Sequence, residues 1–235
     1  MKKIALTIAV YDRLELTRKC YEGIERCKPQ FNEYGYDLDV HICGSFQQEH
    51  NDLAKEFGYK MYNGKNLPLS AKYRYFLKKV INSYDWDFWM LLGSDDFMTE
   101  DAAEIICKQM DSDHLAGMPK NNFYFDLDEG KGFEFKNIQR CGACRWYRRE
   151  VIDQIYDQNL YPKDINQVLD RLSQETIFNQ TGVLPHRFEG SYVCDVKSTV
   201  NINSFNSLKR YHRIKDYHYL NIADYIPEFR TIENV

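Results

Sequence analysis

One apolar run constrains the fold more than any other feature of the sequence. Residues 87–92, Asp-Phe-Trp-Met-Leu-Leu, are followed at once by Gly93 and Ser94 and then by two adjacent acids, Asp95 and Asp96. An apolar run bounded in this way is typical of a central strand of a parallel sheet, which is covered on both faces. Ligands of such sheets bind beyond the carboxyl ends of the strands, so the sequence predicts a site at the two acids.

The adjacent acids indicate a bound cation. Two carboxylates about 4 Å apart at a partly wet site repel each other by roughly 4 kcal/mol, so a cation or a proton usually accompanies them. Mg²⁺ and Mn²⁺ suit oxygen ligands and often bridge carboxylates to phosphates. If Ser94 to Asp96 are still extended, successive side chains point to opposite sides, so one acid should hold the ion and the other a sugar hydroxyl or a water. The alternative is that Ser94, Asp95 and Asp96 cap the following helix.

Composition limits the class of protein. With 235 residues and 43% hydrophobic residues, the chain can bury the core of one domain. No apolar run approaches the roughly 20 residues that span a bilayer, and Met1-Lys2-Lys3 leads into a strand rather than a signal peptide, so we expect a soluble cytoplasmic protein. The net charge of -4 argues against strong nonspecific nucleic-acid binding.

The seven cysteines, an odd number, are scattered through apolar patterns, as is typical of reduced thiols. The pair Cys141 and Cys144 has the spacing of half a zinc site, but no second pair stands at a matching distance. We therefore interpret these two thiols as packing residues.

Strand and helix patterns alternate along the first half of the chain. Strands are expected over residues 4–10, 38–43, 59–62 and 87–92, and helices over residues 16–27, 49–57, from Pro68, and over 102–110 after Thr99 to Asp101. This alternation predicts an α/β fold, a three-layer Rossmann-like sandwich with a mostly parallel central sheet.

The second half has a different pattern. Residues 123–125 and 133–135 predict a β-hairpin, and an apolar stripe from Ile165 to Thr176 predicts a helix that starts at Asp164 and stops near Gly182. We expect this hairpin and helix to form a C-terminal region of the same domain. No repeat or low-complexity linker indicates a second independent domain.

The order of the motifs resembles that of family 2-like glycosyltransferases of the GT-A fold, over roughly residues 3 to 185. The residues that carry the resemblance are Thr7 to Leu16, Gly93-Ser94-Asp95-Asp96, Gly142-Ala143 with Arg145 and Arg149, and Leu169-Asp170. The resemblance implies one GT-A domain with a nucleotide-sugar half (1–110), an acceptor half (111–208) and a C-terminal extension (209–235). It also implies a metal-dependent transfer of a sugar from a nucleoside-diphosphate sugar, a UDP-sugar, to an acceptor hydroxyl with inversion.

The resemblance also implies roles for individual residues. Asp96 and Asp95 would hold Mn²⁺ or Mg²⁺, with Asp95 or Ser94 near the ribose, although Ser94 stands where the family has its usual first Asp. Asp170 would be the general base, with Asp164 and Glu175 as substitutes, and a retaining reaction stays open if Asp170 is not the base. The donor-binding residues would be Ala9, Val10, Tyr11, Arg13, Gly44, Ser45, Ser70, Lys72, Ser94 and Asp95.

Several of these assignments have simpler alternatives. Tyr11 could stack on the base, while Arg13 and Lys72 could face the diphosphate or be solvated surface cations, and Ser70 could cap the helix that follows Pro68. Asp170 lies away from the apolar stripe of its helix, as a solvated residue also would.

The basic, aromatic segment 209–215 could fold over the diphosphate, supply a histidine ligand or contact a polyanionic acceptor. A solvated tail is its simplest interpretation. The histidines considered as a third metal ligand are His186, His212 and His218. The acceptor is expected to be a glycan, a lipid-linked sugar or another hydroxyl compound. The protein itself is expected to attach at most peripherally to the inner membrane face. A nucleic-acid acceptor has no support in the sequence.

Two other functions remain. A sugar-nucleotide pyrophosphorylase would need a glycine-rich phosphate loop after the first strand, and residues 10–13, Val-Tyr-Asp-Arg, contain no glycine. A non-catalytic nucleotide- or carbohydrate-binding protein would have no need of Asp95, Asp96 and Asp170 together.

Overall fold

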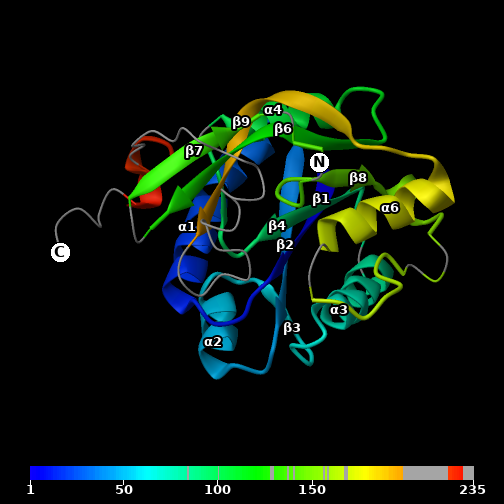
Figure 1. The fold of residues 1–235 in the computed structure, drawn as a ribbon, viewed down its shortest axis with the longest axis horizontal. Coiled ribbons are helices and arrows are strands. Elements are labelled where there is room, and N and C mark those ends of the chain that lie inside the picture. The colour runs from blue at the N-terminus through cyan, green and yellow to red at the C-terminus, as the bar shows by residue number, and fades with distance from the viewer. Residues whose placement is uncertain are drawn as a thin grey trace.

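The chain folds around one curled, mostly parallel sheet with helices on both faces, a three-layer α/β arrangement (Figure 1). The computed structural model describes residues 1–83, 85–99, 101–127, 130–136, 138–139, 141–155, 157, 159–166, 169–197 and 222–229. The predicted fold class is confirmed.

The first half alternates strands and helices as the sequence predicts. Its elements are β1 (Lys2–Ala9), α1 (Leu14–Glu33), β2 (Tyr36–Gly44), α2 (Gln48–Glu56), β3 (Lys60–Asn63), α3 (Leu69–Ser83) and β4 (Phe88–Gly93). The second half is more irregular. Its elements are β5 (Asp96–Met98), α4 (Ala102–Met110), β6 (Ala116–Asp126), β7 (Lys131–Phe135), β8 (Trp146–Arg148), α5 (Arg149–Ile152), α6 (Leu169–Thr181), β9 (His186–Lys197) and the 3-10 helices η2 (Ile222–Asp224) and η3 (Pro227–Phe229).

The register of the sheet brings several strand ends to one edge. Strand β1 pairs in parallel with β2 and β4, and Ala9 lies opposite both Cys43 and Gly93. The strand order is β3-β2-β1-β4-β8-β6-β9-β5, with β7 paired to β6. Strand β8 is antiparallel to both β4 and β6, so it joins the parallel first half to the strands of the second half.

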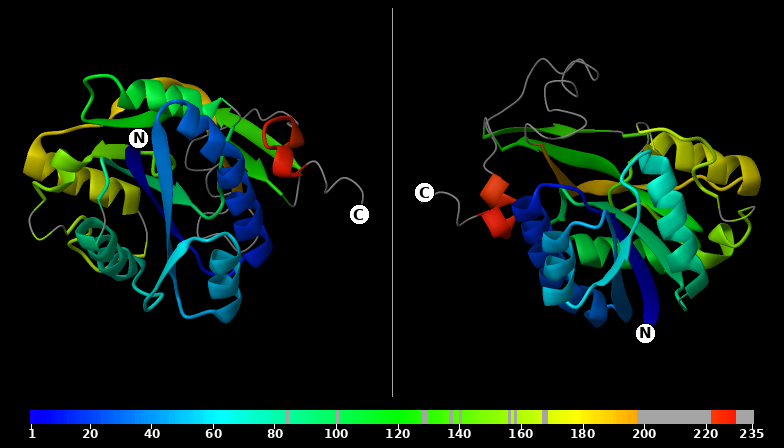
Figure 2. Two further views of the ribbon diagram at one scale, coloured as in Figure 1. Left: turned by 180° about the vertical axis from the view of Figure 1, so that it is seen from behind. Right: turned by 90° about the horizontal axis from the view of Figure 1, so that it is seen from below.

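Successive side chains of β1 point to opposite faces of the sheet, so the strand contributes to the hydrophobic core on each face. Ile4, Leu6 and Ile8 face a core that includes residues of α1 and α4, whereas Ala5 faces the core shared with α3 and α6. Figures 1 and 2 show α3 and α6 on one side of the sheet and α1 and α2 on the other. Because both faces are covered, β4 is apolar along its whole length, as a central parallel strand requires.

The predicted hairpin is confirmed, and the predicted start of the last long helix is wrong. Strands β6 and β7 pair with Asp126 opposite Lys131. Helix α6 begins at Leu169, because Asp164 instead pairs with Arg74 and the Ile165 amide donates to Ser70 Oγ (2.8 Å). The helix ends as predicted before Gly182, whose φ of 71° lies in the left-handed region that favours glycine.

Other expectations concern thiols, membranes and the C-terminal segment. All seven cysteines lie in the described part of the chain and are buried free thiols, and Cys141 and Cys144 pack in the core as interpreted. Among the described residues, no helix has both the length and the apolarity to cross a bilayer. Residues 209–215, with His212, and also His218 lie outside the described residues.

Candidate active site

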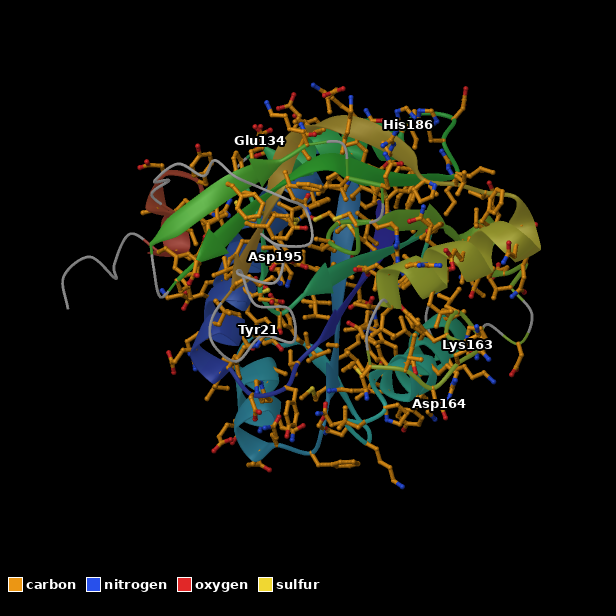
Figure 3. All side chains as sticks on the ribbon, in the orientation of Figure 1. Tyr21, Glu134, Lys163, Asp164, His186 and Asp195 are labelled. Carbon is orange, nitrogen blue, oxygen red and sulfur yellow. The ribbon has the colours of Figure 1, made fainter. Side chains whose placement is uncertain are left out.

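The two adjacent acids lie beyond the carboxyl end of β4 and are joined by a third. Strand β4 ends at Gly93, Ser94 and Asp95 form a turn, and the chain reverses into β5 at Asp96. Strand β5 pairs with β9 so that Asp96 lies opposite Asp195. Carboxylate oxygens of Asp95, Asp96 and Asp195 all lie within 4.8 Å of one another. Because Asp95 lies in the turn and is not extended, its carboxylate and that of Asp96 reach the same point. Figure 3 shows Asp195 near the centre of the molecule.

In the part of the chain that the structure describes, two cations contact this acid cluster, by which we mean Asp95, Asp96 and Asp195. Arg13 Nη1 lies 2.9 Å from Asp95 Oδ2. Lys197 Nζ lies 2.6 Å from Asp195 Oδ1 and 3.4 Å from Asp95 Oδ2. The cluster therefore carries three acidic and two basic groups in a largely buried space.

Backbone geometry explains how Arg13 reaches the cluster. Asp12 (φ 49°) and Arg13 (φ 56°) both occupy the left-handed region, which costs free energy for residues other than glycine. This sharp turn between β1 and α1 aims the guanidinium at Asp95, and Nη2 also donates to Ser94 Oγ (3.0 Å). With 17% of its side chain exposed, Arg13 is not a solvated surface cation.

The acids experience opposite electrostatic environments. Burial raises the pKa of Asp95, but Lys197 and Arg13 outweigh it and hold that pKa below its usual range. Burial and the neighbouring carboxylates of Asp195 and Asp95 raise the pKa of Asp96 well above its usual range. Burial also raises the pKa of Asp195 to about 6, despite Lys197. Asp96 and Asp195 therefore hold a proton more readily than an ordinary carboxyl group, whereas Asp95 ionises more readily.

The alternative that these residues cap a helix does not describe the structure. Helix α4 has Asp101 at its N-cap position. Asp96 Oδ2 accepts a hydrogen bond from the Gly93 amide (2.7 Å), which closes the turn, and Ser94 Oγ accepts from Arg13. A carboxylate oxygen that accepts one amide still has a second lone pair, and the other oxygen of Asp96 adds two more.

The donor atoms of the acid cluster fit a hard divalent cation. Three carboxylates can supply oxygen ligands to one ion, which is the chemistry that Mg²⁺ and Mn²⁺ prefer. Burial and the carboxylates of Asp195 and Asp95 raise the pKa of Asp96 although Lys197 lowers it, so a further cation at the cluster would stabilise its ionised form. Asp95, Asp96 and Asp195 are thus the described residues that could hold a metal.

A cavity of about 420 Å³ lies next to the cluster, at the ends of β1 and β4. Seven of the predicted donor-binding residues line it: Ala9, Val10, Tyr11, Arg13, Lys72, Ser94 and Asp95. Tyr11 is 45% exposed, and its ring centroid lies 5.8 Å from Lys72 Nζ. The remaining lining residues include Asn66, Leu67 and Lys197. We call this space the larger cavity.

Lys72 is buried at the wall of the larger cavity. Only 2% of the residue is exposed, and burial lowers the pKa of Lys72. Its Nζ donates to Val10 O (2.8 Å), Ser45 Oγ (2.6 Å) and Asn66 Oδ1 (3.2 Å). A lysine held only by neutral acceptors in the described part of the chain keeps its positive charge available to an anion.

Three of the predicted donor-binding residues are not among the described residues that line the larger cavity. Gly44 packs beneath Met61, whose Cε would lie 2.3 Å from a Cβ at this position. Ser45 holds Lys72. Ser70 is fully buried and its Oγ accepts from the Ile165 amide, so the predicted helix-capping role of Ser70 is wrong.

A second, smaller cavity of about 180 Å³ lies on the other side of the cluster. Asp96, Asp195 and Asp170 line it, whereas Asp95 lines the larger cavity. Gly93 and Tyr73 line both cavities. The acid cluster therefore stands where the two cavities meet.

Asp170 is positioned by the segment that precedes β8. Arg145 is fully buried, and it donates from Nη1 to Asp170 O (3.0 Å) and from Nη2 to Ser173 Oγ (2.6 Å). Gly142 lies against the Asp170 carboxylate, because a Cβ there would lie 2.2 Å from Oδ1. The Asp170 side chain itself is 56% exposed.

The substitutes considered for Asp170 lie elsewhere. Asp164 pairs with Arg74, and Figure 3 shows it beside α3, away from Asp195. Glu175 pairs with Arg171 on the surface of α6. Of these three acids, Asp170 is the one that lines a described cavity.

Sequence reasoning missed Asp195 and Lys197, and it offered His186 as a candidate ligand. The available signal was the sequence of residues 193–197, Val-Cys-Asp-Val-Lys, in which an acid and a base stand among apolar residues. His186 belongs to the opposite end of β9, where its ring stacks on His114 with centroids 3.8 Å apart. Figure 3 shows it far from Asp195, so His186 does not complete the acid cluster.

Comparison with known proteins connects this chain to solved structures only. No family model and no curated protein sequence matches it. S. aureus TarS 1-349 superposes with a TM-score of 0.53 at 11% identity, over 83% of this chain and 60% of the TarS chain. The same TarS fragment in complex with UDP-GlcNAc gives 0.52 at 13% identity, over 84% and 59%.

A shorter protein matches over nearly its whole length. The 4-diphosphocytidyl-2C-methyl-D-erythritol synthase from Anaerococcus prevotii has a TM-score of 0.51 at 10% identity, over 90% of this chain and 99% of that one. This chain spans about 60% of the TarS chains that it matches. At such low identities the likeness establishes the fold alone. The fold is that of GT-A glycosyltransferases and related nucleotidyltransferases, as the sequence predicted.

Proposed function

We propose that this chain is a metal-dependent glycosyltransferase that moves a sugar from a nucleoside-diphosphate sugar to an acceptor hydroxyl. The observation that carries the proposal is the position of the acid cluster where the larger and smaller cavities meet. A diphosphate at this junction would have its nucleoside in one cavity and its sugar in the other. TarS, whose fold is similar, was solved with UDP-GlcNAc and with UDP, which favours a UDP-sugar as donor.

The sizes of the cavities suit the two parts of such a donor. The larger cavity, about 420 Å³, falls within the roughly 300–1,000 Å³ that small-molecule sites occupy. The smaller one, about 180 Å³, suits a single sugar ring. In the larger cavity the exposed ring of Tyr11 can stack on the base, and Arg13 and Lys72 supply positive charge for the diphosphate.

Asp95, Asp96 and Asp195 would hold Mn²⁺ or Mg²⁺ in this proposal. When bound, the ion offsets the negative charge that develops on the departing nucleoside diphosphate. Arg13 Nη1 donates to Asp95 Oδ2 (2.9 Å) and so holds the Asp95 carboxylate in place at the edge of the larger cavity.

Asp170 is the proposed general base. The acceptor oxygen forms a bond to the anomeric carbon while the bond from that carbon to the diphosphate oxygen breaks, and the acceptor proton passes to an Asp170 carboxylate oxygen. Asp170 lines the smaller cavity and Asp95 the larger one, which supports a base and a leaving group on opposite sides of the sugar. We therefore propose that the reaction inverts the anomeric centre. The proposed acceptor is a glycan, a lipid-linked sugar or another hydroxyl compound.

Product analysis tests the proposal. A panel of nucleotide sugars is incubated with candidate acceptors, with and without Mn²⁺, and nucleoside diphosphate and pyrophosphate are measured separately. Metal-dependent release of nucleoside diphosphate is the expected result. Release of pyrophosphate would instead identify a sugar-nucleotide pyrophosphorylase, and binding without release would identify a non-catalytic binding protein.

A matched pair of variants tests the base. Asp170→Asn should lower kcat by roughly 10²–10⁴-fold while nucleotide affinity stays unchanged, because the residue contacts the acceptor side. Asp164→Asn, on the same segment but paired with Arg74, should leave kcat unchanged. Loss of UDP affinity in Asp170→Asn would show that its role is assigned wrongly.

A further inference from the structure

Lys197 contacts the acid cluster and the larger cavity at once. Its Nζ lies 2.6 Å from Asp195 Oδ1 and 3.4 Å from Asp95 Oδ2, and the residue is 8% exposed. It also lines the larger cavity beside Asp95 and Arg13. The lysine thus occupies oxygen atoms of two of the three acids that a divalent cation would need.

The charge of the cluster makes Lys197 and a divalent cation compete for the same carboxylates. Among the described residues, three ionised carboxylates and the two cations Arg13 and Lys197 would leave one formal negative charge in the cluster. A divalent ion added to that arrangement would make it net positive and would stand within a few ångströms of the ammonium group. Like charges at that distance in a poorly solvated site repel strongly, so the ion and the ammonium cannot share Asp195 and Asp95.

Of the two cations, Lys197 is the one able to leave. Arg13 is fixed by a strained backbone and binds two groups, Asp95 and Ser94, through separate nitrogens. Lys197 carries its charge on a compact ammonium group at the end of a flexible four-carbon side chain, so the group can move to a new partner. The larger cavity, which Lys197 lines, is the one in which the diphosphate is proposed to find positive charge.

We propose that Lys197 is an internal counter-ion that competes with the divalent cation for the acid cluster and transfers its contact to the donor diphosphate when the cation binds. The inference rests on the proposed function, which supplies both ligands. It makes metal and diphosphate binding cooperative, because each ligand removes an obstacle to the other, and this coupling must be reciprocal.

Metal titrations test the inference without any measurement of catalysis. Mn²⁺ is titrated into the chain alone and into the chain with saturating UDP, with free Mn²⁺ followed by electron paramagnetic resonance. In the wild type, UDP should strengthen Mn²⁺ binding by roughly tenfold or more. In Lys197→Met, Mn²⁺ alone should bind roughly tenfold more tightly than to the wild type, and the effect of UDP should shrink. Unchanged or weaker binding of Mn²⁺ alone to Lys197→Met would overturn the inference.

Three further variants act as controls. Lys197→Arg keeps the charge and should retain the weak metal binding of the wild type. Lys120→Met removes a lysine of β6 that pairs with Glu189 away from the cluster, and it should change nothing. Lys197→Gln replaces the Met variant if that protein does not fold, because glutamine keeps a hydrogen-bond donor toward Asp195. It should show the same tighter binding of Mn²⁺ alone.

The outcomes separate this inference from the proposed function. If the wild type and the Lys197 variants bind Mn²⁺ with equal affinity and metal-dependent sugar transfer is intact, the inference is overturned but the proposed function is not. Failure of Mn²⁺ to bind to any of these proteins would overturn both. The titration without nucleotide is also independent of whether UDP is the correct diphosphate.

Discussion

At the scale of single residues, the two adjacent acids have become chemically different. Asp95 contacts Arg13 and Lys197, whereas Asp96 faces carboxylates and accepts one amide. The pKa of Asp95 is accordingly lowered and that of Asp96 raised, and environments that drive two pKa values apart in this way usually mark a functional site. Asp96 is therefore the acid whose ionised form an added cation would stabilise most.

Asp96→Asn should separate metal binding from folding. The amide removes a ligand, so Mn²⁺ affinity should fall by more than roughly tenfold and metal-dependent turnover should be lost. It also removes repulsion from Asp95 and Asp195 and can still accept from the Gly93 amide, so the melting temperature in chelator should equal or exceed that of the wild type. Calorimetric melting with and without Mn²⁺ measures both effects. A variant that melts lower in chelator would contradict this account.

Gly142→Ala should displace the proposed base without touching the larger cavity, which is proposed to hold the nucleotide. A Cβ at Gly142 would lie 2.2 Å from Asp170 Oδ1 and 2.8 Å from its Cγ, so the carboxylate must move. We expect kcat to fall at least tenfold while UDP affinity, measured by calorimetry, is unchanged. Gly64→Ala is the control, because the nearest atom to its Cβ is Tyr75 Cδ1 at an ordinary 3.4 Å. Equal kcat in both variants would argue against Asp170 as the base.

At the scale of elements, the sequence predicts the regular half of the chain well. The strands from β1 to β4 and the helices between them have clear periodicity, since each strand is bounded by turn residues and each helix has an apolar face. Strands β5 and β8 have three residues each, too few to show a period. Strand β9 was not predicted, because its polar and charged residues interrupt the apolar pattern.

Which site residues could be predicted also depended on whether they belong to a local sequence pattern. Asp95, Asp96 and Asp170 were recognised because each belongs to a local motif with a family resemblance, and the cavities contain all three. Asp195 and Lys197 reach the site through the pairing of β5 with β9, which no local pattern encodes. Sequence reasoning could therefore name the acids of one strand end but not their partners from a distant strand.

The pairing of β2 with β3 gives a pH-dependent test at this scale. Lys60 Nζ on β3 and His41 Nε2 lie 2.6 and 3.2 Å from Asp39 Oδ2 on β2. Although burial raises the pKa of Asp39, His41 and Lys60 lower it to about 2. The folded pKa is below the unfolded value of about 3.9, so the stabilisation is present above pH 4 and is lost as the pH falls from about 4 to 2.

Asp39→Asn should therefore lower the free energy of unfolding at pH 7 by about 1–2 kcal/mol, an amount discounted for partial exposure of the carboxylate. The difference from the wild type should vanish near pH 2. Urea unfolding at a series of pH values measures it. Asp113→Asn, an exposed acid after α4, should give no difference at any pH. A constant loss at all pH values would show that the ion pairs do not cause the effect.

At the scale of the whole molecule, segments distant in the sequence pack against strand β5, which begins at Asp96. The 3-10 helices η2 and η3 pack beside α1, as Figure 2 shows, and Arg26 of α1 links them by donating to Glu228 Oε1 (2.7 Å) and to Met98 O (2.7 Å). Phe229 is 2% exposed and lies edge-on to Phe97 with ring centroids 5.0 Å apart. Phe97 follows Asp96 directly, so the packing of residues 222–229 stabilises the strand that carries a proposed metal ligand.

Phe229→Ala should consequently weaken both the fold and the acid cluster. Loss of a fully buried ring costs roughly 3–5 kcal/mol, and the cavity left beneath Phe97 should loosen β5 and lower Mn²⁺ affinity several-fold. Urea unfolding and a Mn²⁺ titration below the transition measure the two effects. Phe178→Ala on α6, where the ring is 43% exposed, is the matched control and should change neither by much. A Phe229→Ala protein that loses stability but keeps full Mn²⁺ affinity would show that β5 is positioned by its pairing with β9 alone.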